Sequence, residues 1–221
     1  MSGAARAPAT GRPRPARVRA PQSRGDTARA ALLGAAERVF ARAGFSGATT
    51  AAIAKAAGVP KANLHYHFGS KHGLYHEVLA RTLHDWLVPM DSLIADADPR
   101  EALSAYIRAK MAMSAERPDA SRVFANELLH GAPVLGRLMR TELRATVKQK
   151  ACVIDGWIAA GRMAPVDATH LFFTIWAATQ TYADFDVQVR AVLGRARLSG
   201  RDHARAAEHV TSLVLRGCGL T

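Results

Sequence analysis

Apolar residues recur at helical spacing along most of the chain, and turn-forming residues divide this pattern into segments. A first helix is predicted to begin near Asp26, which can cap its N-terminus, and to end at Gly44. Its apolar positions recur every three or four residues: Leu32, Ala36, Val39, Phe40 and Ala43. This spacing predicts an amphipathic helix with one buried face.

Two short helices are predicted to follow. The first begins at Thr49-Thr50 and ends at Gly58. The second begins next to Pro60, whose missing N–H costs nothing in a first helical turn, and runs to Phe68. A tight turn that contains glycine therefore separates two helices of about two turns each, after a longer helix that can pack on both.

The rest of the chain also shows helical spacing. Ser70 is expected to cap a longer helix that ends between residues 86 and 90, where Pro89 can kink or stop it. Beyond Pro99 there is no alternating strand pattern, and five segments are predicted to be helical: 100–117, 119–130, 134–160, 167–193 and 202–216. The predicted fold class is all-α.

Composition narrows the class of protein. The chain has 221 residues, of which 49% are hydrophobic, but it contains no stretch of about 18–20 uncharged apolar residues such as a membrane-spanning helix needs. No secretory signal is recognisable, so we expect a cytoplasmic protein. Cys152 and Cys218 lack metal-type spacing, and we expect two free thiols rather than a redox switch.

The formal net charge of +12 points to a polyanionic partner, and half of it lies in residues 1–24. This segment has six arginines, four prolines and no acidic residue, so we expect a disordered arm over residues 1–25. The arm could contact DNA phosphates or enter a minor groove, or it could be a solvated leader with only weak nonspecific attraction.

The two short helices have the layout of a DNA-binding helix-turn-helix. Ile53, Val59, Leu64 and Phe68 can form a compact core, and several alanines allow close helix packing. A polar outer face then remains: Lys61, Ala62, Asn63, His65, Tyr66 and His67. These residue types suit contacts to phosphates and base edges, although the same face could belong to a three-helix packing unit that only meets water.

The motif decides between these alternatives. From Asp26 to about Trp86 the chain resembles the TetR family of bacterial regulators, most closely over RVFARAGFSGATTAAIAKAAGVPKANLHYHFGSKHGLYHEVL. The resemblance implies that Thr50 is a cap and a phosphate contact and that Lys61, Ala62 and Asn63 read bases. It also implies groove or phosphate contacts by four more residues: His65, Tyr66, His67 and Lys71. Gly69 stands where the family usually has proline, and Pro60 where it more often has a small polar residue.

A second resemblance concerns residues 106–135 and 154–185, which look like the subgroup of regulators that control pyrimidine utilisation. It implies that uracil or thymine binds the protein and weakens its hold on operator DNA. Trp176 and Gln180 are neighbours on one helix face, where an indole can stack on a flat heterocycle and an amide can pair with its edge. Trp86 offers another aromatic wall. Trp176 could equally be plain core, and Gln180 could bond across a dimer interface.

The resemblance also implies a homodimer formed by helices 167–193 and 202–216, which would match a palindromic operator with half-sites about 34–36 Å apart. The expected domains are the arm (1–25), the helix-turn-helix domain (26–86) and a helical effector-binding and dimerisation domain (87–221). Repression is the family default.

Other functions find little support in the sequence. His72 and His76 have a spacing that can hold zinc, but no third ligand is evident, so we expect no metal and no cofactor. No phosphate loop, nucleophile elbow or other catalytic motif occurs, and an enzyme is not expected. A nucleoid-packaging protein that binds DNA through charge alone is the remaining alternative, although packaging does not require so long a helical domain.

Overall fold

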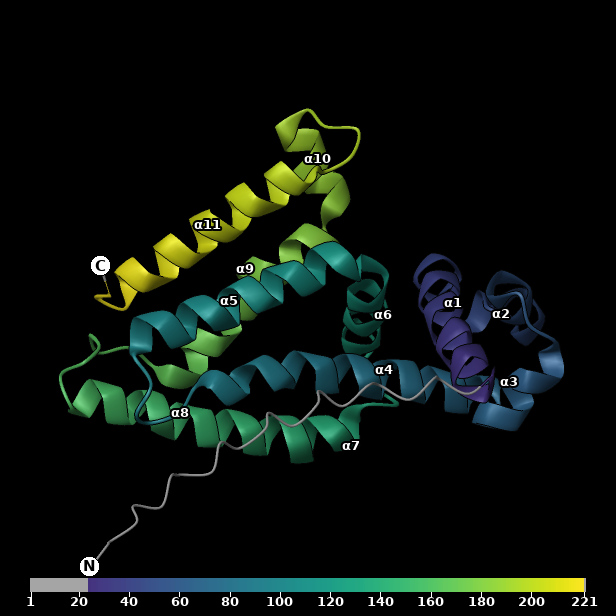
Figure 1. Cartoon of the computed structure of the whole chain (residues 1–221), viewed down its shortest axis with the longest axis horizontal. Helices are drawn as coiled ribbons and strands as arrows, with labels where there is room; N and C mark the ends of the chain where they lie inside the picture. Colours follow the sequence, from purple (N-terminus) through teal and green to yellow (C-terminus); the bar gives the residue numbers. More distant parts are fainter. Residues whose placement is uncertain (1–23, 221) are drawn as a thin grey trace, which may run out of the picture.

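The computed structural model describes residues 24–220, and within this range it contains helices and connecting turns but no strand (Figure 1). The all-α prediction is therefore confirmed. The predicted basic arm lies outside the described residues except for its last two positions, because the first helix already begins at Arg24.

Three helices form one end of the elongated molecule, and a fourth runs from this end along the rest of it (Figure 1). They are α1 (Arg24–Gly47), α2 (Thr50–Ala57), α3 (Lys61–Phe68) and α4 (Lys71–Leu87). The backbone leaves the helical conformation at Gly44, the predicted end of the first helix, so a kink separates the last residues of α1. We call α1 to α3 and the first half of α4 the head.

Close backbone packing fixes how α3 meets α4. Gly69 ends α3 with φ 70°, a value that proline cannot adopt because its ring holds φ near −65°. A Cβ atom on Gly73 would lie 2.2 Å from the carbonyl oxygen of Phe68, so only glycine fits in the first turn of α4. In this chain the α3–α4 connection is tight and needs glycine at position 69, where the family usually has proline.

The remaining helices form the body. After the 3₁₀ turn η1 (Val88–Ser92), the elements are α5 (Pro99–Glu116), α6 (Pro118–Leu129), α7 (Gly136–Leu138), the π-helical turn η2 (Met139–Leu143), α8 (Arg144–Ala159), α9 (Ala168–Asp184), α10 (Asp186–Leu193) and α11 (Gly200–Gly217). Pro99 and Pro118 lie in the first turns of α5 and α6, close to the helix starts predicted from the sequence.

Two of the predicted helices need correction. The segment 134–160 begins at Gly136 and contains the wider π-helical turn η2. The segment 167–193 is two helices, because Phe185 has non-helical backbone angles and Asp186 begins α10. Asp186 accepts from Arg190 at 2.8 Å within the first turns of α10. Neither break carries the glycine or proline that marks the other helix ends.

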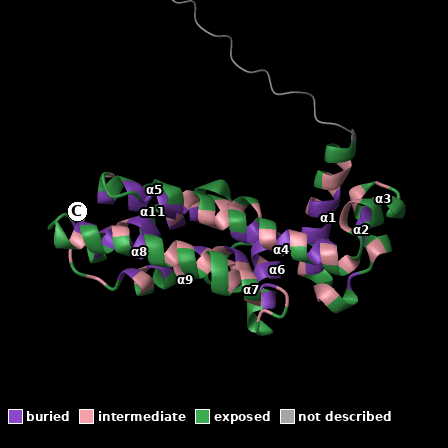
Figure 2. Cartoon of the chain, turned by 90° about the horizontal axis from the view of Figure 1, so that it is seen from below, coloured by how far each residue is buried: buried purple, intermediate pink, exposed green. Residues whose placement is uncertain are grey.

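Buried side chains form two apolar cores, and Figure 2 shows them running along the inside of both ends. One core joins α5, α8, α9 and α11. The other lies in the head and also takes in Val123 and Phe124 of α6 and Leu135. Since α6 contributes to the core of the head, the head and body share packed surface across the predicted boundary at residue 86, which stays a prediction.

Candidate DNA-binding and effector sites

The helix α3 lies at the far end of the head, with one buried side and one open side (Figure 1). Leu64 is completely buried and anchors the helix on the core. Lys61, Ala62, His65 and Tyr66 are exposed, whereas Asn63 and His67 are half-buried. Tyr66 is 85% exposed, which shows that its ring is not needed for packing within the chain. The structure thus brings most of the predicted DNA contacts together on one short helix.

The cap of α2 differs from the prediction. Thr49, not Thr50, is the N-cap residue, and its hydroxyl accepts a hydrogen bond from the backbone N–H of Ala52 at 3.1 Å. Thr50 is the first helical residue and half-buried. The reason is the backbone of Thr49, which is still extended (φ −116°, ψ 149°) and therefore lets its side chain fold back over the first turn.

Replacing Thr49 with alanine is expected to lower the free energy of unfolding by about 1 kcal/mol, because the first turn of α2 loses its cap. Thr50→Ala is the matched control and should change it by less than about 0.5 kcal/mol. Urea unfolding of both variants measures the difference. Equal losses would contradict the assignment of the cap to Thr49.

Lys71 has a role that the sequence did not indicate. Its ammonium donates to the carbonyl oxygens of Phe45 at 2.9 Å and Ala48 at 3.0 Å, and it lies 4.4 Å from the centre of the Phe45 ring. These carbonyls belong to the end of α1 and the connection to α2, where helix carbonyls have no helical partner. Lys71 therefore stabilises the α1–α2 corner, and its predicted phosphate contact remains a prediction.

His65 and His67 also contact their own helix. The Nδ1 atom of His65 lies 3.1 Å from the carbonyl oxygen of Gly69, and the His67 ring packs edge-on to Tyr66. Within residues 24–220, no group of three or more histidine, cysteine or acidic side chains is placed to hold a metal ion. Both cysteines are free, and burial raises the pKa of Cys218 to about 11.

An ion-pair cluster joins the head to the body. Arg117, at the junction of α5 and α6, donates to Glu37 of α1 and to Asp85 of α4, each at 2.5 Å. Burial by itself would lower the pKa of Arg117, but the hydrogen bonds to Glu37 and Asp85 and the negative charges of these carboxylates outweigh it and raise the pKa. We call Arg117, Glu37 and Asp85 the arginine clamp. It connects three helices directly beside Trp86, one of the predicted effector residues.

A second polar connection lies deeper. Glu127 of α6 is 3% exposed and accepts from the Tyr75 hydroxyl at 3.2 Å. Its other carboxylate oxygen accepts from the backbone N–H groups of Val134 at 2.6 Å and Leu135 at 3.0 Å. Burial is the main cause of the raised pKa of Tyr75, and the negative charge of Glu127 adds to it. Glu127 thereby ties the α6–α7 connection to α4.

The three predicted effector residues do not line one common hollow. Trp86 borders a hollow of about 270 Å³ together with Met113 and Arg117. Trp176 borders another, of about 490 Å³, on the side of α8. Gln180 is half-buried, and no hydrogen bond of its side chain occurs among the described residues. What lies between the two tryptophans is α5.

Tyr106 and Lys110 of α5 connect the two tryptophans. Trp176 donates from its indole nitrogen to the Tyr106 hydroxyl at 2.7 Å. One turn further along α5, the Lys110 ammonium lies 3.8 Å from the centre of the Trp86 ring. Residues four apart share a helix face, so one side of α5 contacts both aromatic walls.

Lys110 is the most unusual residue of this region. It is 2% exposed, and its ammonium makes no hydrogen bond to any described residue. Burial lowers its pKa to about 7, although the negative charge of Asp184 on α9 opposes the shift. Burial likewise raises the pKa of Asp184, which accepts from the Ser121 hydroxyl at 2.6 Å. A buried lysine without a hydrogen-bond acceptor is costly and often functional.

The sequence contains a signal for the unusual position of Lys110. The buried face of α5 repeats every three or four residues, and Lys110 falls on it between Ile107 and Met111. A charged residue at a core position is rare unless it has a partner. Asp184 and Arg117 gave no such signal, because both lie at helix ends where charged residues are common.

A three-helix head with an exposed recognition helix, attached to a larger helical body, defines a helix-turn-helix regulator. A family model described as bacterial regulatory proteins of the tetR family matches residues 32–78, and one described as the C-terminal region of YcdC-like proteins matches residues 79–221. The chain is 41% identical over 187 residues to the HTH-type transcriptional regulator RutR of Escherichia coli K12, across 85% of this chain and 88% of that protein. The chain therefore belongs to the TetR family and is a DNA-binding transcriptional regulator, not an enzyme.

Solved structures support the fold. A regulator from Streptomyces coelicolor, 23% identical, aligns with a TM-score of 0.65 over 88% of this chain and 99% of its own. The ketosteroid regulator KstR2 of Mycobacterium tuberculosis, 20% identical, aligns with a TM-score of 0.68 over 86% and 94%. No helix between residues 24 and 220 is long and apolar enough to cross a membrane.

Proposed function

We propose that the chain is a repressor that binds a palindromic operator as a homodimer and is released by a small planar effector of the pyrimidine type, such as uracil or thymine. The observation that carries this proposal is the buried Lys110 beside Trp86. A pyrimidine carries N–H and C=O groups, so a site for it needs unused hydrogen-bonding groups inside the protein, and Lys110 supplies one of them.

The residues around α5 suit a flat, neutral heterocycle. Uracil and thymine carry two ring carbonyl oxygens, and the Lys110 ammonium can donate to one of them. The Gln180 amide offers both a donor and an acceptor, which match adjacent N–H and C=O groups of such a ring. The indole of Trp86 provides a face for stacking. The hollow beside Trp86 has about 270 Å³, close to the lower end of small-molecule pocket volumes of about 300 Å³, and its lining residues include neither Lys110 nor Gln180.

For the DNA site we propose that Lys61, Ala62 and Asn63 read bases at the start of α3. The exposed His65 and Tyr66, together with Thr50, His67 and Lys71, would contact phosphates or the groove. The exposure of α3 supports this assignment, because a helix that enters the major groove must keep one side free of intramolecular packing.

Asn63→Ala is expected to reduce discrimination at one base pair of each half-site by about 1–3 kcal/mol, since an asparagine amide pairs with adenine through two hydrogen bonds. Competition binding with operator variants measures it. The control is Lys71→Ala, at a proposed phosphate contact, whose lost charge should weaken operator and random DNA alike and flatten the salt dependence. If Asn63→Ala lowered the affinity for operator DNA and for random DNA equally, Asn63 would not read a base.

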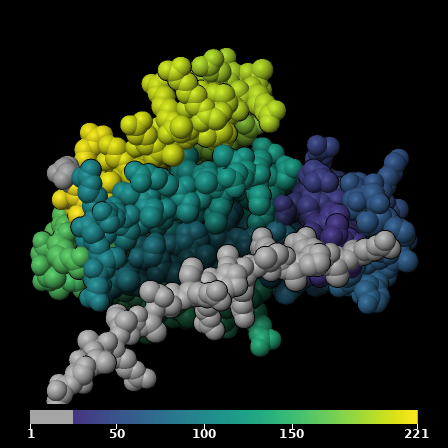
Figure 3. Space-filling view, viewed as in Figure 1, coloured from purple at the N-terminus to yellow at the C-terminus, as the bar shows by residue number. Residues whose placement is uncertain are grey.

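The dimer is proposed to form through α9, α10 and α11. Large apolar side chains are exposed on these helices and at the break between α9 and α10: Phe173, Phe185, Val187, Val192, Leu193 and Leu213. Figure 3 shows α10 protruding from the body, where a second copy can reach it. Exposed apolar residues in this number mark an interaction surface.

Selection of genomic DNA fragments on the full-length protein, followed by sequencing, tests the proposal as a whole. We expect a palindromic motif that is depleted when uracil or thymine is added. A palindromic motif whose enrichment does not change with uracil or thymine would support operator binding but contradict the pyrimidine effector. Enrichment without any motif would contradict operator recognition and favour DNA binding through charge alone.

A further inference from the structure

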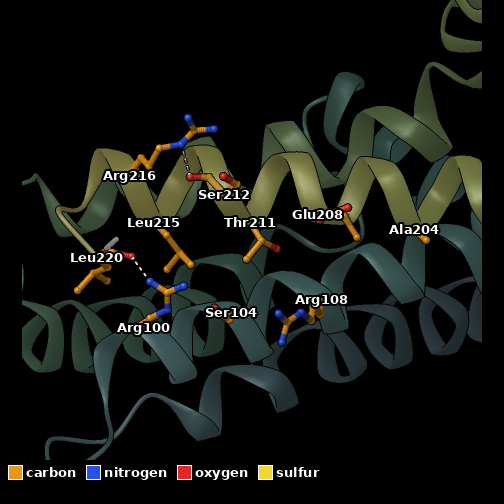
Figure 4. Close-up of a pocket in the computed structure, with 11 residues that line it drawn as sticks. Arg100, Ser104, Arg108, Ala204, Glu208, Thr211, Ser212, Leu215, Arg216 and Leu220 are labelled. Atoms are coloured by element: carbon orange, nitrogen blue, oxygen red, sulfur yellow. Dashed lines mark hydrogen bonds between the residues drawn. The ribbon is translucent and has the colours of Figure 1, made fainter.

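A second hollow lies on the outside of the body, between α5 and α11 (Figure 4). It is a groove of about 840 Å³, and the effector residues discussed above do not line it. Arg100, Ser104 and Arg108 line it from α5, and Thr211 and Leu215 line it from α11. The three α5 residues are spaced four apart and therefore form one stripe along the helix.

The groove is positively charged. Arg100 donates from one guanidinium nitrogen to the carbonyl oxygen of Leu220 at 3.0 Å, which leaves most of its five N–H donors unused. Arg108 has no hydrogen bond or ion pair with any described residue. Among the described residues of the lining, Glu208 is the one acidic side chain. Figure 4 shows the Arg216 guanidinium on the far side of α11, where it donates to the backbone carbonyl oxygen of Ser212 at 3.3 Å.

The buried hydroxyl of Thr211, on the α11 side of the groove, has no hydrogen-bond partner. Thr211 is 6% exposed, and its Oγ1 atom has no hydrogen bond. The other buried helical threonines, Thr82 and Thr179, donate to the carbonyl oxygen one turn earlier, each at 2.8 Å. Thr211 does not, and Figure 4 shows its side chain directed from α11 toward α5. Leaving a buried hydroxyl unsatisfied is costly, which points to a missing ligand atom.

We propose that this groove binds a small phosphomonoester, with the phosphate between Arg100 and Arg108 and in reach of the Thr211 hydroxyl. Guanidinium groups bind phosphate oxygens through paired, charge-assisted hydrogen bonds. Donors that come from two facing helices suit the tetrahedral oxygens of a phosphate better than the flat pair of a carboxylate. Leu215 and Leu220 give the organic part of the ligand an apolar surface.

The proposed dimer leaves the groove open. Leu213 is 58% exposed and is two residues from both Thr211 and Leu215 along α11. Two residues correspond to about 200° around a helix, so Leu213 points away from the groove. The phosphomonoester site is therefore separate from the proposed subunit contact as well as from the effector site.

Isothermal titration of the full-length protein with phenyl phosphate tests the inference, with benzoate as the carboxylate of the same shape. We expect phenyl phosphate to bind and Arg108→Gln to weaken it by about tenfold or more. Thr211→Val should also weaken binding without lowering the melting temperature, since it removes an unsatisfied group. Glu208→Gln should tighten binding about twofold to fivefold by removing the opposing charge.

Two control variants test whether phenyl phosphate binds in the groove between α5 and α11. Arg205→Gln removes an exposed arginine of α11 that does not line the groove, and Lys61→Gln tests phosphate binding at the head; both should leave the affinity unchanged. Absence of binding at millimolar phenyl phosphate would overturn the proposal. So would equal binding of benzoate, or an affinity that changes with Lys61 and not with Arg108.

Discussion

Replacing Arg117 with alanine is expected to lower the free energy of unfolding by about 2–3 kcal/mol, because it removes the central cation of the arginine clamp. Glu37 is 8% exposed and would keep a carboxylate at the surface of the core without its partner. Asp85 would lose the closer of its two arginines. Chemical unfolding of the purified protein measures the loss.

Arg81→Ala provides the matched control. Arg81 also pairs with Asp85, but at 3.7 Å and on an exposed helix face, so its loss should cost less than about 0.5 kcal/mol. The double variant Arg117→Met with Glu37→Gln should recover part of the stability, since it removes the uncompensated charge. Equal effects of Arg117→Ala and Arg81→Ala would mean that the clamp is an ordinary surface ion pair.

Replacing Lys110 with methionine is expected to abolish the response of operator binding to the effector and, at the same time, to stabilise the protein by about 1–4 kcal/mol near neutral pH. Methionine fills a similar volume without a charge, so the core keeps its packing. Operator affinity without effector should stay the same. Titration of uracil or thymine into the operator complex measures the response.

The pH dependence of the free energy of unfolding shows how much of the effect of Lys110→Met comes from the charge of the lysine rather than from its shape. Its pKa is about 7 in the folded protein and 10.5 in its ordinary state, so between these values the unfolded chain binds a proton that the folded chain lacks. Stability of the wild type should therefore rise with pH across this window, by up to about 1.4 kcal/mol per pH unit, relative to Lys110→Met. A constant difference between the two proteins from pH 7 to pH 10 would show that Lys110 does not titrate there. If Lys110→Met is more stable than the wild type but operator binding still responds to uracil or thymine, Lys110 is not part of the effector site.

Most helices could be predicted from sequence because glycine, proline and capping residues mark their ends. Gly58 and Ser70 end and begin helices as expected. The break at Phe185 and the π-helical turn η2 were not predicted because neither coincides with a glycine, a proline or a side-chain cap. Periodicity alone cannot distinguish a continuous helix from two helices with the same apolar face.

The sites were predictable to different degrees. The exposed face of α3 follows from local spacing and the position of Leu64, since a short helix has only one side to bury. The effector region depends on contacts between helices far apart in sequence, such as Lys110 with Trp86 and Trp176 with Tyr106. The sequence indicated the aromatic residues but could not show that α5 lies between them. The arginine clamp joins residues 80 and 32 positions apart, a distance that local patterns do not report.

The glycine at position 73 has a mechanical consequence for operator release. Because the backbone of Gly73 lies so close to the carbonyl oxygen of Phe68 that no Cβ atom fits between them, we expect α3 to move together with α4 when α4 tilts. A 17-residue helix is about 25 Å long, so a tilt of about 5° at its body end displaces α3 by about 2 Å. In a two-fold dimer both recognition helices shift, and their separation changes by up to about 4 Å against a half-site spacing of about 34–36 Å. We therefore expect a tilt of a few degrees in α4 to shift the two recognition helices relative to successive major grooves.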